Sequence, residues 1–153
     1  MCKLSPWHVA LLAAAFVAGA AHSETISVAV ASNFTAPMRD IAQAFAQDTG
    51  HEAQLSFGAT GKFYAQINHG APFGMLLAAD DTTPAKIAKE GQGDASTRFT
   101  YAVGKLVLWS PQSGYVDSQG QVLKKNDWQH IALANPRRAP YGLAAEQTLA
   151  KLG

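Results

Sequence analysis

The sequence predicts an α/β fold in which a parallel sheet is covered by helices on both faces. Two observations lead to this prediction. Short apolar runs of strand length alternate with segments whose apolar residues recur at helical spacing. Polar turns, rich in Ser, Asn, Thr and Gly, join the end of a strand to the start of the next helix. This alternation is typical of parallel strands joined by crossover helices.

The first half of the chain contains three such units. The first helix has Met38, Ile41, Ala42 and Phe45 on one face, and Gly50 is suited to end it in a left-handed conformation. Asp80 and Asp81 precede a proline and are expected to cap the last of these helices rather than hold a ligand. In order, we predict a strand at 26–31, a helix at 34–49, a strand at 53–57, a helix at 62–68, a strand at 74–79 and a helix opened by 80–84.

The pattern changes near residue 96. Residues 98–110 (RFTYAVGKLVLWS) form an extended segment that is long enough to leave one sheet and enter another. A turn-rich stretch follows, and we then predict a strand at 131–134, a loop at 135–142 and an amphipathic helix at 143–152.

The N-terminus has the pattern of a secretory signal peptide. Lys3 precedes an apolar run at 9–21, and small residues flank His22 before Glu24. The alternative is a membrane anchor, but a spanning helix needs about 20 apolar residues, and this run is shorter. We therefore predict that residues 1–23 are removed on export.

Composition narrows the classes of function. The one cysteine, Cys2, lies in the predicted signal, so the mature chain would have none, which fits a periplasmic protein better than a disulfide scaffold. Loss of Lys3 would leave as many basic as acidic residues, 11 of each. A neutral chain without a basic patch is not expected to bind nucleic acid. The length suits one domain of ordinary size.

Two polar turns indicate a site for a small anion. Ser32 and Asn33 follow the first predicted strand, and Thr60 lies in a Gly-Ala-Thr-Gly turn after the second. Helix N-termini carry about half a positive charge and N–H groups without partners, so they attract anions. Parallel strands would place both turns at the same edge of a sheet. The alternative is that each residue is only an ordinary helix N-cap.

Five segments resemble one known family, the periplasmic molybdate-binding proteins of ABC importers. They are 31–38 (ASNFTAPM), 55–67 (LSFGATGKFYAQI), 70–73 (GAPF), 98–110 (RFTYAVGKLVLWS) and 134–142 (ANPRRAPYG). The resemblance implies a two-lobed periplasmic binding protein, similar to type II, that captures molybdate or tungstate and delivers it to an inner-membrane permease. It also implies a monomer without a cofactor.

Carried over by motif, the resemblance implies oxyanion contacts from Ser32, Asn33, Thr60 and Tyr141, which would meet the metal only through the oxygens of the anion. Ala59 stands where the family often has serine, so it would offer only its backbone N–H. The family's chains are longer. We therefore expect a first lobe at 24–102 and an incomplete second lobe at 103–153.

Other classes of function are less well supported by the residues. The turn at 58–62 differs from a nucleotide-binding phosphate loop because Phe63 replaces the required Ser or Thr. No nucleophile and base are paired, so an enzyme is not expected. Three alternatives stay open: a binding protein for another oxyanion such as sulfate, a ligand-sensing domain of a regulator, and a fragment that binds nothing.

Overall fold

The centre of the molecule is a three-stranded parallel sheet with the strand order β2-β1-β3. The computed structural model describes residues 23–125 and 128–152, so the predicted signal peptide lies outside the described residues except for Ser23. The sheet forms where the sequence predicts strands. Its members are β1 (Thr25–Ala31), β2 (Glu52–Gly58) and β3 (Met75–Leu77).

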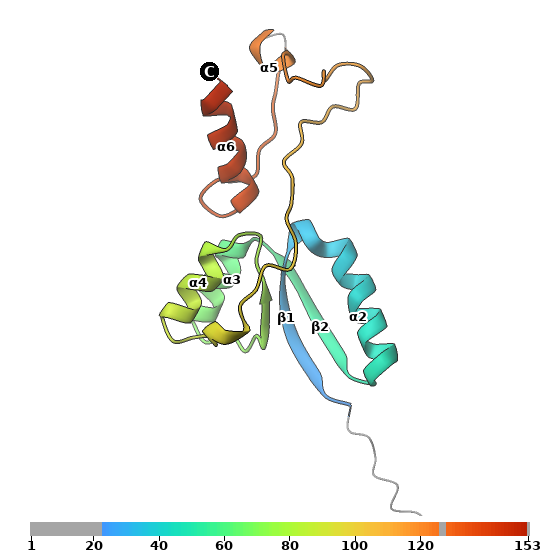
Figure 1. Ribbon diagram of the computed structural model, residues 1–153, viewed down its shortest axis with the longest axis vertical. Coiled ribbons are helices and arrows are strands. Elements are labelled where there is room, and N and C mark those ends of the chain that lie inside the picture. The colour runs from blue at the N-terminus through green and yellow to red at the C-terminus, as the bar shows by residue number, and fades with distance from the viewer. Residues whose placement is uncertain (1–22, 126–127, 153) are drawn as a thin grey trace, which may run out of the picture.

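Helices cover both faces of the sheet (Figure 1). The chain passes from β1 to β2 through α2 (Thr35–Thr49) and from β2 to β3 through α3 (Thr60–Asn68). These two steps run in opposite directions across β1. Because parallel crossovers are right-handed, the two helices must lie on opposite faces. A third described helix, α4 (Thr82–Lys89), packs beside α3.

The core is centred on β1, which has a paired strand on each side and a helix over each face. Val28 and Val30 are almost fully buried and pack with Met38 of α2. Ala29 and Ala31 alternate with them and are equally buried, so they belong to the other face. A strand that is buried on both faces explains the continuous apolar run in the sequence.

The predicted apolar face of α2 is only partly correct. Met38 and Ala42 pack against the core, but Ile41 is 50% exposed and Phe45 is 37% exposed. The helix packs mainly against β2 and less against β1, so only a narrow stripe of it is covered by the sheet. The predicted end of this helix is correct, because Gly50 has a φ of 73° and its N–H donates to the carbonyl of Ala46.

The second half has little regular structure among the described residues. After a short 3-10 turn, η3 (Ala95–Thr97), the chain crosses the sheet edge, and the only helices among its described residues are α5 (Val122–Lys125) and α6 (Pro140–Leu152). The helix predicted at 143–152 is therefore confirmed. The strand predicted at 131–134 is wrong, since no described strand lies beside it to accept its backbone hydrogen bonds. For the same reason, residues 98–110 form no strand.

Truncation of a core valine should destabilise the fold. Val30→Ala removes two buried methyl groups from β1, and we expect a loss of about 2 kcal/mol in the free energy of unfolding. The same substitution at Val103, which is 87% exposed, is the matched control and should change it by less than about 0.5 kcal/mol. Urea denaturation followed by circular dichroism measures both. Equal losses in the two variants would contradict this assignment of the core.

Candidate functional site

The carboxyl ends of the three strands meet at one edge of the sheet. Ala31 pairs with Gly58 in the β1–β2 register, and Val30 pairs with Leu77 in the β1–β3 register. The chain therefore leaves neighbouring strands at Ser32 and at Ala59, while Ala78 and Ala79 follow β3 beside them. This is the edge at which open parallel sheets generally bind ligands.

Ser32 and Asn33 begin the 3-10 turn η2 (Ser32–Phe34) and are exposed. No side chain caps η2 or α2, although the carbonyl of Ser32 accepts a hydrogen bond of 2.8 Å from the Thr35 hydroxyl. The alternative in which Ser32 is an ordinary N-cap is therefore wrong. Within the described part of the chain, neither the Ser32 hydroxyl nor the Asn33 amide has a hydrogen-bond partner.

Thr60 is the first residue of α3 and is only 1% exposed. Its hydroxyl oxygen accepts a hydrogen bond of 3.0 Å from the backbone N–H of Ala79. The N-cap position belongs to Ala59, so the capping alternative is wrong for Thr60 also. Thr60 instead ties the start of α3 to the end of β3. Because a hydroxyl can donate as well as accept, Thr60 keeps one proton for a further partner.

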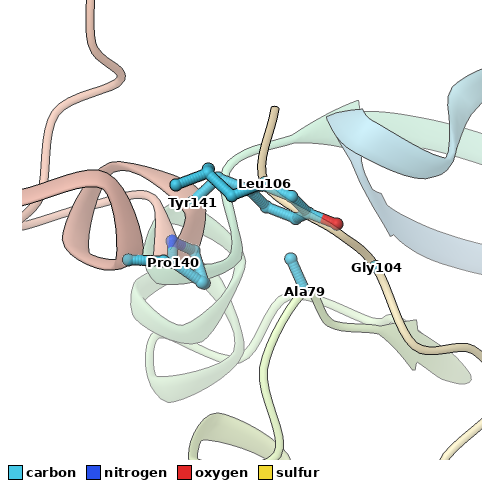
Figure 2. A pocket seen from close by; sticks show the side chains of 6 residues that line it. Ala79, Gly104, Leu106, Pro140 and Tyr141 are labelled. Atoms are coloured by element: carbon cyan, nitrogen blue, oxygen red, sulfur yellow. The ribbon is translucent and has the colours of Figure 1, made fainter. Parts of the chain in front are cut away.

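Tyr141 lies in the first turn of α6 and lines a cavity of about 180 Å³. Figure 2 shows its hydroxyl pointing towards the backbone at Gly104. A Cβ atom at Gly104 would overlap that hydroxyl, so a larger residue there would displace the Tyr141 side chain. The cavity is lined by Ala79, Gly104, Leu106, Pro140, Tyr141 and Ala144. The structure thus brings Tyr141 to Ala79, the residue that also binds Thr60.

The loop before α6 is held against the start of α3. The Gly61 N–H donates a hydrogen bond of 3.3 Å to the carbonyl of Arg138. A Cβ atom at Gly142 would overlap the carbonyl oxygen of Ala134, so α6 can approach its own loop closely only with glycine there. These contacts fix the N-terminus of α6 above the carboxyl edge of the sheet.

Sequence reasoning missed Tyr101. Its hydroxyl donates a hydrogen bond of 2.8 Å to the carbonyl of Ala78, and its ring packs edge-on against Phe34 at 4.9 Å between centroids. Burial raises the pKa of the Tyr101 phenol above its ordinary value, and the neighbouring Tyr141 raises it further. In the sequence, Tyr101 is one aromatic residue within an apolar run, so no pattern marked it.

The charged residues near this edge cap a helix or are exposed to solvent. The Asp80 carboxylate accepts hydrogen bonds from the Thr83 N–H at 2.6 Å and from the Thr82 hydroxyl at 2.9 Å, so its predicted capping role is confirmed. Asp81 makes no side-chain cap, so that prediction is wrong for Asp81. Lys62 is exposed. Within residues 23–125 and 128–152, no His, Cys, Asp or Glu cluster could hold a metal ion, and no helix is long and apolar enough to cross a membrane.

Comparisons with known proteins bear on the fold and the family of the chain. A family model described as bacterial extracellular solute-binding protein matches residues 26–153, which is nearly all of the chain after the predicted signal. This chain belongs to that family. Membership explains the parallel sheet flanked by helices. It also agrees with the predicted two-lobed fold class, in which the second lobe of this chain is incomplete.

Individual solute-binding proteins show strong similarity to the chain. It is 62% identical over 145 residues to the molybdate-binding protein ModA of Azotobacter vinelandii, covering 95% of this chain and 58% of the relative. Identity to ModA of Rhodobacter capsulatus is 49% over 134 residues, covering 88% and 52%. The solved periplasmic molybdate-binding protein of Azotobacter vinelandii superposes with a TM-score of 0.80 at 48% identity, over 84% of this chain and 55% of that one. The chain thus spans a little over half the length of these relatives.

The bond between Thr60 and Ala79 should contribute to stability. Thr60→Val keeps the side-chain shape but removes the acceptor, leaving a part-buried N–H unpaired, and we expect a loss of about 1–3 kcal/mol in the free energy of unfolding. Thr60→Ser keeps the hydroxyl and should lose clearly less. Chemical denaturation compares the variants. A serine variant as unstable as the valine variant would show that the methyl group, and not the hydrogen bond, matters here.

Proposed function

We propose that this chain is a periplasmic solute-binding protein for molybdate or tungstate. The observation that carries the proposal is the meeting of three groups at one sheet edge: the uncapped turn with Ser32 and Asn33, the start of α3 at Thr60, and Tyr141 across from Ala79. The names of the similar proteins, which are molybdate-binding proteins, support the choice of ligand.

The chemistry of these groups suits a fully deprotonated oxyanion. Ser32, Asn33, Thr60 and Tyr141 are neutral donors, and the backbone N–H of Ala59 adds one more. Donors of this kind hold a doubly charged anion through charge-assisted hydrogen bonds and helix dipoles. A protonated phosphate would need one of these groups to accept its proton, which leaves the anion with one donor fewer than a fully deprotonated oxyanion has. Because Thr60 is nearly buried, an anion would have to approach its hydroxyl closely at the sheet edge beside Ala79.

The proposal also covers the location and the partner of the protein. We propose that the signal pattern directs the protein to the periplasm and that a bound anion passes to an inner-membrane ABC permease. The protein acts as a monomer, uses no cofactor and catalyses no reaction. Residues 24–102 form the first lobe and residues 103–153 belong to the second, with Tyr141 supplying the contact from that side.

Calorimetric titration with sodium molybdate tests the proposal. We expect Ser32→Ala or Asn33→Ala to weaken molybdate binding by about tenfold or more, because a hydrogen bond to a charged group is worth about 1.5–3 kcal/mol. Ser113→Ala is the matched control, since Ser113 is an exposed turn residue, and it should leave the affinity unchanged.

Parallel titrations with tungstate and sulfate decide between the remaining possibilities. Tighter binding of sulfate than of molybdate would assign the site to another oxyanion. If all three anions give no heat of binding and no rise in melting temperature, the chain binds none of them, because a ligand of the native state must stabilise it.

A further inference from the structure

Tyr101 contacts two of the three strand ends that form the proposed site. Its hydroxyl binds the carbonyl of Ala78, next to the residue that Thr60 holds. Its ring packs on Phe34, the last residue of the turn that begins with Ser32 and Asn33. One side chain therefore joins the turn after β1 to the end of β3, although these segments lie more than 40 residues apart in the chain.

The same segment also meets the third group. Gly104 follows Tyr101 by three residues, and the hydroxyl of Tyr141 lies against its backbone (Figure 2). The raised pKa of Tyr101, to which Tyr141 contributes, fits two phenols that lie near each other. The flanking residues give this segment little other support, since Phe99 is 78% exposed and Val103 is 87% exposed. Tyr101 is thus its principal attachment to the sheet at this point.

We propose that Tyr101 is a positioning residue, which anchors residues 101–104 to the sheet edge and so fixes where Tyr141 stands relative to Ser32, Asn33 and Thr60. This role rests on the proposed function. Tyr101 need not touch the anion, because its hydroxyl is already committed to Ala78. Its effect on binding passes through Tyr141, so the two residues must be energetically coupled.

A double-mutant cycle on the full chain tests the coupling. Tyr101→Phe keeps the ring on Phe34 and removes only the bond to Ala78. Titration with sodium molybdate should show a loss of affinity of about tenfold for Tyr101→Phe in the parent chain, and of less than about threefold when Tyr141 is already Phe. A purely structural role would give the same fold-loss in both backgrounds, and that result would overturn the proposal.

Two further variants sharpen the cycle. Tyr64→Phe is the matched control, because it also removes a tyrosine hydroxyl bonded elsewhere, to Glu90 at 3.0 Å, and it should not change molybdate affinity. Gly104→Ala should weaken molybdate binding in the parent chain. It should weaken binding less when Tyr141 is already Phe, because the overlapping hydroxyl is then gone, and it replaces Tyr101→Phe if that variant fails to fold.

The outcomes separate the two proposals. If the parent chain binds no molybdate, the proposed function is refuted, and the role of Tyr101 with it. If the parent chain binds molybdate but the losses are additive, only the role of Tyr101 is refuted.

Discussion

The pairing of β1 with a parallel strand on each side is the constraint on which the rest of the structure depends. Once β1 is central, its residues must be apolar on both faces, as Val28 to Ala31 are. The two crossovers must then run in opposite directions and place their helices on opposite faces. The same pairing brings the strand ends to one edge in register, so the polar turns become neighbours without any direct bond between them.

Three hydrogen bonds hold the carboxyl edge of the sheet together. Thr60 accepts from Ala79, Tyr101 donates to Ala78, and the carbonyl of Arg138 accepts from Gly61. All of these acceptors and donors are neutral. A site stabilised in this way keeps its shape without buried charges, which would carry a large desolvation cost if they were left unpaired. The exposed donors at Ser32 and Asn33 are not used in that framework.

The local pattern of the sequence predicted the first half of the fold well, and the reasons are local. β1, α2, β2 and α3 each carry the apolar period of their element, and Gly50 and Asp80 mark helix ends by their backbone and hydrogen-bonding chemistry. In the second half the helix at 143–152 was predicted, but the strand at 131–134 did not form. Its residues have the composition of a strand, and a strand exists only when another strand pairs with it.

The candidate site shows the same division. Ser32 and Asn33 could be located because they follow a strand that is easy to recognise, and Tyr141 because its motif resembles a known family. The Thr60 hydroxyl bonds the backbone of Ala79, and the Tyr101 hydroxyl bonds the backbone of Ala78. Both alanines are distant in sequence from their partners and carry no polar side chain. Backbone groups bear no signature in a sequence, so contacts made to them could not be foreseen.

The segment that crosses the sheet edge also bears on how the chain behaves in solution. Its odd-numbered side chains Phe99, Val103, Val107 and Trp109 are each more than 75% exposed, and Lys105 is the one charged residue from 99 to 109. An extended segment with alternating apolar residues and unpaired backbone groups can pair with a strand of another molecule. We therefore expect this segment to favour self-association at high protein concentration, and a charged residue in place of Val103 or Val107 to act as a gatekeeper against it.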